Sequence, residues 1–105
     1  MVFKLPKKEG FAHAVYAKLL RVPKGKVTTY AALAHAVGTR AYRAIGQVMN
    51  KNPYAPDVPC HRVISSDGNL GGYAGGEKRK LAMLKAEGIV FKNGKVEEKY
   101  ILREL

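Results

Sequence analysis

The sequence has no Trp, a single Cys and few acidic residues. Because Cys60 has no second cysteine to pair with, an internal disulfide is excluded, and with it a disulfide-stapled scaffold. One Cys and three widely spaced His are too few for a zinc site, so we expect no metal. No apolar run reaches the roughly 20 residues of a membrane span, and no signal core follows the basic N-terminus. We therefore expect a reduced, soluble protein of the cytoplasm, associated with the nucleoid (nuclear in a eukaryote), with no membrane partner.

The shortage of acids leaves a large positive charge. The 19 Lys and Arg outnumber the 8 Asp and Glu, which gives the 105-residue chain a formal net charge of +11 at pH 7. Such an excess favours a polyanionic partner, most often nucleic acid, because each phosphate contact releases counterions. A basic surface that serves only solubility is the alternative. The 47% hydrophobic content is ordinary for a globular protein, and the length predicts a single domain over 1–105.

Apolar side chains at steps of three and four, with turn residues between them, predict four helices. They cover residues 9–22, 30–37, 40–50 and 77–87. Thr28 or Thr29 is placed to cap the second helix, and Gly38 to end it. Two short helices joined by a turn that contains glycine are typical of a helix-turn-helix, although many antiparallel helix pairs look similar.

The remaining segments predict little regular structure. Three prolines in 52–60 exclude a helix there, 61–65 is a candidate buried strand, and 70–76 is a Gly-rich loop without P-loop spacing. Asn-Gly at 93–94 between apolar residues predicts a hairpin with a type I′ turn, and 97–105 supports no more than a short final helix. The pattern predicts an α+β, mainly helical fold, a winged-helix-like domain with a helix-turn-helix and a short C-terminal β-hairpin.

The third predicted helix has an unusual composition. Ala41, Ala44 and Gly46 are small, and Arg40 and Arg43 flank them. A helix with little side-chain bulk and projecting arginines can approach DNA closely. Tight packing between helices explains the small residues equally well.

Cys60 and His61 are the candidate reactive centre. A free thiol has a pKa of about 8.5 and needs a neighbouring base to become a nucleophile at neutral pH. In an extended chain adjacent side chains point to opposite faces, so contact between these two requires a turn or a bridging water. The candidates for a third group that orients the imidazole are Asp57, Asp67, Glu77 and Glu87. An inert buried thiol and a packed core histidine are the alternative interpretation.

Several separated motifs carry a family resemblance. Residues 59–63 read PCHRV, the signature of the methylated-DNA–protein-cysteine methyltransferases, also called alkylguanine-DNA alkyltransferases. Upstream, 25–30 resembles the start of the family's helix-turn-helix, 43–46 its RAVG motif and 52–53 its Asn-Pro motif. Downstream, 72–76, Lys80 and 87–88 fall at the family's spacing. The resemblance covers roughly residues 10–90.

This resemblance implies a DNA repair reaction with no cofactor. The protein would move the alkyl group of O-6-alkylguanine irreversibly to its own Cys60, once per molecule. His61 would act as the base through a water, and Glu87 would orient it. Asn52 would hold the active-site turn by hydrogen bonds.

The resemblance also implies how DNA is bound. A target base inside a duplex must be flipped out. Tyr30 would push on its phosphate and donate a hydrogen bond to the departing base, and Lys80 would assist electrostatically. Arg43 matches the family's arginine finger, which fills the gap. The third helix would lie in the minor groove of double-stranded DNA, with little sequence specificity, and the protein would be a monomer. The other implied DNA contacts are Thr29, Arg40, Ala41, Ala44, Gly46 and Ser66.

The implied substrate pocket is built around the Gly-rich loop. Its residues are Met49, Val63, Tyr73, Ala74, Gly75 and Gly76. Ala74 stands where many members have a hydroxyl residue, which removes one hydrogen bond to the substrate oxygen. Many members also carry an additional N-terminal domain, which we expect to be absent here.

Two other functions remain as alternatives. Short alkyltransferase-like proteins resemble this chain in size and flag lesions without catalysis, but they replace the cysteine. A winged-helix regulator with a redox-sensing Cys60 would explain the charge, yet it leaves Asn52, Tyr73 and Glu87 unexplained.

Overall fold

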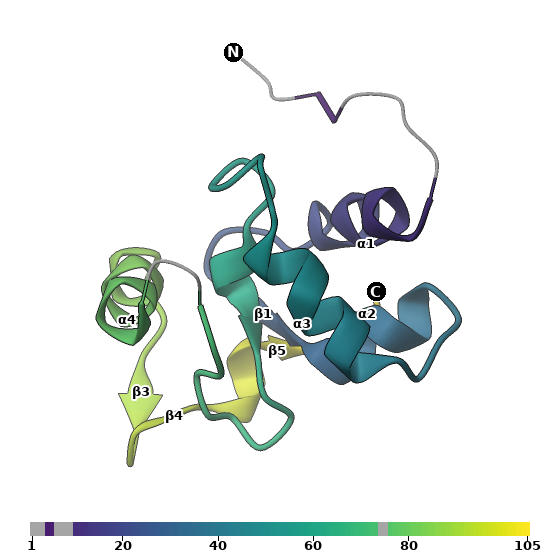
Figure 1. Cartoon of the computed structure of the whole chain (residues 1–105). Helices are drawn as coiled ribbons and strands as arrows, with labels where there is room; N and C mark the ends of the chain where they lie inside the picture. The colour runs from purple at the N-terminus through teal and green to yellow at the C-terminus, as the bar shows by residue number, and fades with distance from the viewer. Residues whose placement is uncertain (1–3, 6–9, 74–75) are drawn as a thin grey trace.

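The computed structural model describes residues 4–5, 10–73 and 76–105. In chain order the elements are α1 (Phe11–Leu19), β1 (Val27–Thr29), α2 (Tyr30–Ala36), α3 (Tyr42–Asn50), the 3-10 turn η1 (Cys60–Arg62), β2 (Val63–Ile64), α4 (Glu77–Ala86), β3 (Phe91–Lys92), β4 (Lys95–Val96), the 3-10 turn η2 (Glu98–Tyr100) and β5 (Ile101–Leu102) (Figure 1). The α+β, mainly helical class is confirmed, and all four predicted helices form, each somewhat shorter than predicted.

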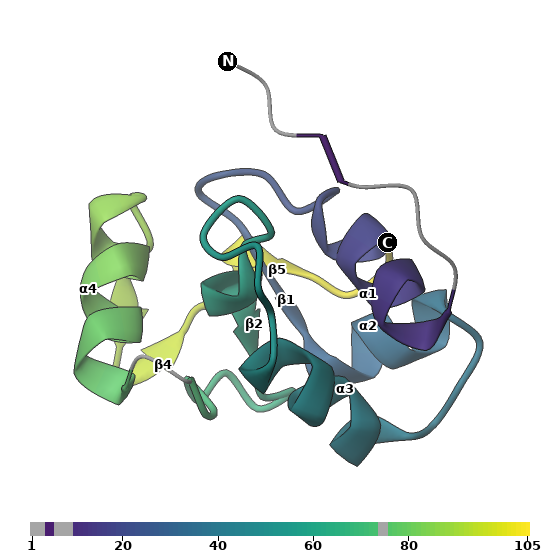
Figure 2. The ribbon, with the colours of Figure 1, turned by 45° about the horizontal axis from the view of Figure 1, so that its top comes forward.

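A small parallel sheet divides the molecule into layers. Its strand order is β2-β1-β5, with both neighbours of β1 parallel to it. Helices α1, α2 and α3 lie on one side of the sheet, and α4 with the β3–β4 hairpin lies on the other (Figure 2). Successive strand residues point to opposite faces, so Val63 joins the core under α1–α3 while Ile64 joins the core under α4.

The helix-turn-helix begins at a side-chain cap. The Thr29 hydroxyl accepts a hydrogen bond from the backbone N–H of Ala32 at 3.0 Å, which satisfies a donor in the first turn of α2. Thr28, the other candidate cap, instead donates its hydroxyl to the Leu102 carbonyl at 2.7 Å and so links β1 to β5. Gly38 follows α2 with a φ of 78°, as predicted for the residue after a helix.

The hairpin has the predicted turn. Asn93 and Gly94 have φ values of 54° and 77°, and positive φ at both central positions is what a type I′ turn requires. The hairpin does not join the parallel sheet, since β3 and β4 pair only with each other among the described residues.

Three short segments differ from what the sequence predicted. The candidate strand over 61–65 is only Val63–Ile64, because the chain makes a 3-10 turn at Cys60–Arg62 first. No final helix forms in the described C-terminal stretch: a single 3-10 turn leads into β5. Strand β1 was not predicted at all, since its last residue, Thr29, is also the cap of α2 and no turn separates the two elements.

Within the described residues, the longest helix, α4, has 10 residues, and no helix is long and apolar enough to span a membrane. No group of three or more His, Cys, Asp and Glu side chains that could hold a metal ion is found in that part of the chain.

Candidate functional site

The turn that carries Cys60 is held by one amide side chain. Asn52 donates its Nδ2 to the Val58 carbonyl at 2.8 Å, and its Oδ1 accepts from the backbone N–H of Tyr54 at 2.9 Å. The Cys60 N–H also bonds to the Val58 carbonyl, at 2.9 Å. This is the geometry expected of Asn52 as the residue that closes the proline-containing segment. Cys60 is therefore presented at the start of η1 on a fixed backbone.

His61 is buried and faces one carboxylate. Its Nε2 lies 2.9 Å from Oε2 of Glu87, so of the four acidic candidates the structure selects Glu87. A carboxylate accepts hydrogen bonds, so Nε2 carries the ring proton and Nδ1 keeps its lone pair. Nδ1 is buried and has no hydrogen-bond partner among the described residues. Burial, together with the charges of Arg62 and Lys80, lowers the pKa of His61 by more than the hydrogen bond and charge of Glu87 raise it, so the ring is neutral at neutral pH.

Arg62, which the sequence analysis left without a role, binds the same carboxylate. Its Nε donates to Oε1 of Glu87 at 2.9 Å and its Nη2 to Oε2 at 2.8 Å, a bidentate pair. Burial alone would raise the pKa of Glu87, but hydrogen bonds from Arg62 and His61 outweigh it and hold that pKa below its usual range. Arg62 lies inside the PCHRV motif, directly after the predicted base, and this position in the sequence could have identified it as a residue of the site.

Lys80 is completely buried and donates to three backbone carbonyls. Its Nζ bonds to Val63 and Leu70, and to Gly72 at 3.1 Å. Burial is the main cause that lowers the pKa of Lys80 to about 8, and the nearby charge of Cys60 acts in the opposite direction. The ammonium thus lies close enough to Cys60 to stabilise a thiolate there.

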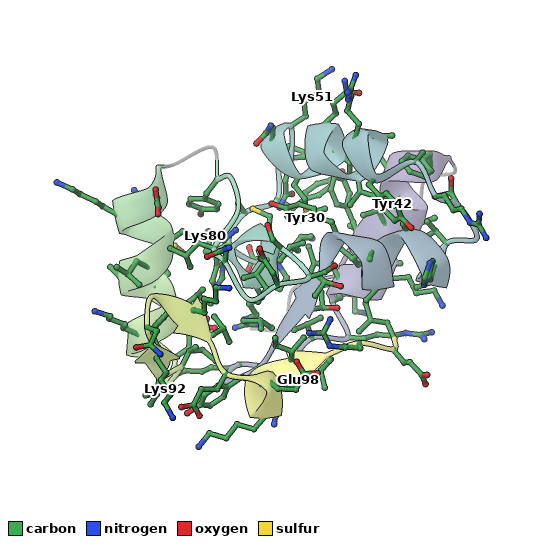
Figure 3. All side chains as sticks on the ribbon, turned by 90° about the horizontal axis from the view of Figure 1, so that it is seen from below. Tyr30, Tyr42, Lys51, Lys80, Lys92 and Glu98 are labelled. Atoms are coloured by element: carbon green, nitrogen blue, oxygen red, sulfur yellow. The ribbon has the colours of Figure 1, made fainter. Side chains whose placement is uncertain are left out.

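Tyr30 reaches the same loop from the start of α2. Its hydroxyl donates to the Gly72 carbonyl at 3.2 Å, so Tyr30 and Lys80 share one acceptor; both labelled side chains lie toward the middle of the molecule in Figure 3. Burial, followed by the charge of Cys60, raises the pKa of Tyr30. A Cβ on Gly71, whose φ is 73°, would come within 3.1 Å of the Tyr30 ring, so glycine is needed there.

A cavity of about 220 Å³ opens beside Cys60. Its lining residues are Met49, Asn50, Asn52, Ala55, Pro56, Cys60, Tyr73, Arg79 and Met83. Met49 and Tyr73 were predicted as pocket residues and lie here. Arg79 and Met83 were not predicted. Both lie in the first two turns of α4, as does the predicted site residue Lys80, and that position in the helix could have identified them.

Other predicted pocket residues lie elsewhere. Val63 is fully buried in the core under α1–α3 and is not a pocket wall; only its carbonyl takes part, as an acceptor for Lys80. Gly76 is exposed at the N-terminal end of α4 and does not line the cavity. Ala74 and Gly75 lie outside the described residues.

The exposed side of α3 carries the predicted DNA-binding side chains. Arg40, Ala41 and Arg43 are exposed and Ala44 is partly buried. A Cβ added at Gly46 would meet no atom of the described chain within 4 Å. Packing between the described helices therefore does not explain Gly46.

Two predicted DNA contacts outside α3 differ in accessibility. Thr29 is 2% exposed and its hydroxyl caps α2, so its side chain offers little surface for a contact, and its role in DNA binding stays a prediction. Ser66 is exposed, and its carbonyl accepts a hydrogen bond from Arg103 at 3.1 Å.

Comparison with known sequences gives a consistent result. The family of the 6-O-methylguanine DNA methyltransferase DNA-binding domain matches residues 10–89. The chain is 46% identical over 83 residues to a methylated-DNA–protein-cysteine methyltransferase of Methanosarcina barkeri, which covers 78% of this chain and 52% of that protein. It is 43% identical over 79 residues to the protein of the same name from Saccharolobus solfataricus, covering 75% and 51%. The chain spans about half the length of these curated relatives.

Two solved structures are similar in fold. O6-methylguanine-DNA methyltransferase from Pyrococcus kodakaraensis superposes with a TM-score of 0.71 at 43% identity, covering 77% of this chain and 47% of that one. S. pombe Atl1, in complex with damaged DNA containing O6-carboxymethylguanine, superposes with a TM-score of 0.74 at 32% identity, covering 87% and 93%.

Proposed function

The chain belongs to the 6-O-methylguanine DNA methyltransferase family, and from that premise we propose that it repairs DNA by accepting the alkyl group of O-6-alkylguanine on Cys60, once per molecule. One observation carries the proposal: Cys60 lines a cavity while the adjacent His61 is neutral, is held by Glu87 and keeps a free Nδ1 lone pair. A thiol beside an oriented base is the arrangement that nucleophilic catalysis requires.

The side chains of the site can supply the base and the proton donor that alkyl transfer requires. Nδ1 of His61 takes the Cys60 proton through a water, and the thiolate attacks the alkyl carbon. A C–S bond forms as the C–O bond to guanine breaks, and the departing base takes a proton from the Tyr30 hydroxyl. Lys80, which is buried with its Nζ bonded to three backbone carbonyls, assists electrostatically. The product is a stable thioether, so Cys60 is not regenerated.

DNA binding follows from α3 and the charge of +11. We propose that α3 enters the minor groove, where Ala41, Ala44 and Gly46 allow close approach and Arg43 fills the space left by the flipped base. Phosphate contacts from a basic surface carry no sequence information, which suits a protein that recognises a lesion in any context. We further propose that residues 1–105 act as one domain and as a monomer.

A second function has one observation in its favour. S. pombe Atl1, 32% identical to this chain, was solved in complex with damaged DNA containing O6-carboxymethylguanine. The alternative is therefore a protein that binds the lesion without accepting the alkyl group. Cys60, placed at the cavity beside His61, favours transfer.

The deciding experiment mixes the protein with duplex DNA that contains one O-6-methylguanine and measures intact mass, followed by peptide mapping. We expect a gain of one methyl in place of one hydrogen, located on Cys60. In the Cys60→Ser variant we expect no mass gain but unchanged binding to the lesion, because serine keeps the shape of the site without a thiolate. Absence of transfer by the unaltered protein, with tight binding to the lesion, would instead support the binding function.

A further inference from the structure

The Glu87 carboxylate at the end of α4 is shared by two neighbours from η1. Arg62 occupies both of its oxygens, and His61 Nε2 shares Oε2 with the Arg62 Nη2. The third nitrogen of the guanidinium, Nη1, donates to the carbonyl of Val22, just after α1, at 2.9 Å. The guanidinium is thus fixed from two sides, with its plane set by the carboxylate and its tip by the backbone.

We propose that Arg62 is a positioning residue, which compensates and orients the Glu87 carboxylate so that His61 stays an uncharged base directed at Cys60. This inference rests on the proposed alkyl transfer and deepens it, because it assigns a role in that reaction to a residue outside the substrate cavity. Arg62 does not line the cavity beside Cys60, and its effect on the reaction passes through Glu87 and His61.

The effect of Arg62 on His61 is electrostatic. A lone carboxylate beside a buried imidazole favours the charged imidazolium, and an imidazolium cannot take the proton of Cys60. The positive charge of Arg62 offsets that carboxylate while the hydrogen bond from Nε2 to Glu87 is retained. Burial is the largest cause that lowers the pKa of His61; Glu87 raises it, and Arg62 and Lys80 lower it. Removal of Arg62 therefore leaves Glu87 to act on His61 with less opposition.

The groups that face His61 come from several elements. They are Cys60 and Arg62 in η1, Lys80 in α4, Glu87 after α4 and Lys24 in the turn between α1 and β1. A hollow of about 400 Å³ opens on this side of the network, and Lys24, Arg62 and Glu87 all line it. Glu87 and Arg62 are therefore both reached from this hollow, which Cys60 does not line.

The test is the pH dependence of methyl transfer in Arg62→Met under single-turnover conditions. Loss of the guanidinium raises the pKa of His61, so the acidic limb of the rate profile moves to higher pH. A shift of about one unit makes the variant about tenfold slower than the unaltered protein at pH values well below the His61 pKa, and leaves the two rates within about threefold at pH values well above it. A contact that only supports the fold would lower the rate by the same factor at every pH, and that result would overturn the proposal.

Two variants serve as controls. Lys24→Met removes another cation from the same hollow, one that makes no hydrogen bond or ion pair with the described residues. We expect an unshifted profile, and a shift equal to that of Arg62→Met would assign the effect to general charge rather than to this contact. In the Glu87→Gln background, Arg62→Met should shift the limb less than it does in the unaltered protein, because only the direct effect of the Arg62 charge on His61 remains.

An NMR titration of the His61 ring, which needs no alkyl transfer, separates this inference from the proposed function. If the unaltered protein transfers no methyl group, the proposed function fails, and the titration still decides the role of Arg62. An unchanged His61 pKa in Arg62→Met overturns the inference while the proposed function stands. Should Arg62→Met fail to fold, Arg62→Lys replaces it. That variant keeps the positive charge but loses the bidentate contact with Glu87. We expect it to raise the pKa of His61 by less than half of the amount by which Glu87→Gln lowers it.

Discussion

A single proton position decides what His61 can do. With Nε2 donating to Glu87, the lone pair is on Nδ1, the nitrogen that lacks a partner among the described residues. The opposite tautomer would place a lone pair against a carboxylate and leave no base for Cys60. Asn52 and Glu87 thus fix Cys60 and His61 in different ways. The Asn52 amide holds the backbone that leads to Cys60, and the Glu87 carboxylate holds the ring of His61.

The Glu87→Gln variant tests this tautomer. Glutamine can still accept from Nε2 but no longer stabilises a charged ring, so we expect the maximal rate of methyl transfer to fall about a hundredfold. The pKa of His61 should fall further, which moves the acidic limb of the profile to lower pH, opposite to the shift expected for Arg62→Met. Single-turnover rates across the pH range measure both quantities. A profile identical to that of the unaltered protein would remove Glu87 from the mechanism.

At this scale the motifs predicted which residues lie at the candidate site, and the roles of those residues stay predictions. Cys60, His61, Glu87 and Asn52 were identified because they fall in motifs, and the structure brings them together. Val63 was misplaced for a physical reason: in a two-residue strand its side chain had to face the core, while its carbonyl faced Lys80. No local pattern states which face of so short a strand is buried.

Among the elements, α3 is the one whose composition departs most from what its own packing requires. Gly46 is partly exposed in the middle of the helix, where glycine costs stability and where a methyl group would touch nothing. A glycine at this position lowers the stability of the helix, and no contact within the described residues compensates for that loss.

The Gly46→Ala variant should therefore separate stability from binding. We expect unfolding to become harder by about 1 kcal/mol, measured by urea denaturation, because alanine is the better helix former. Binding to duplex DNA should weaken, as measured by fluorescence anisotropy. The reaction with free O-6-methylguanine base, which needs no groove, is the internal control and should keep its rate. Equal affinity for duplex DNA in both proteins would show that α3 does not approach DNA at this position.

The elements also show which structure a sequence predicts by itself. The hairpin was predicted because Asn93-Gly94 determines it locally. Strand β5 was not, because its partner β1 lies more than 70 residues earlier, as the Thr28–Leu102 hydrogen bond records. A strand of two residues is too short to show an alternation of apolar and polar side chains, so its sequence does not reveal a parallel partner more than 70 residues away.

For the molecule as a whole, one buried cation sets part of the dependence of stability on pH. The pKa of Lys80 lies near 8 in the folded protein, against 10.5 for an ordinary lysine. Between these values the unfolded chain binds more protons than the folded one, so stability rises with pH; below about 8 both states are protonated and the cost of burying the charge is complete.

Comparison with Lys80→Met measures this effect. The free energy of unfolding of the unaltered protein, relative to that of the variant, should increase by about 3 kcal/mol between neutral pH and about pH 10.5. Urea denaturation of both proteins at each pH gives the difference, and ionisations common to both cancel. A difference that stays constant with pH would mean that Lys80 remains protonated throughout this range in the folded protein.

The parallel sheet has a consequence for how the protein is made. A ribosome releases α1, α2 and α3 first, and β1 then acquires β2 as its first neighbour. Glu87 emerges about 25 residues after His61, and β5 follows later still. The helix-turn-helix is thus available to nascent-chain contacts before His61 has the carboxylate that orients it. Chemical reactivity at Cys60 is among the last properties that the growing polypeptide acquires.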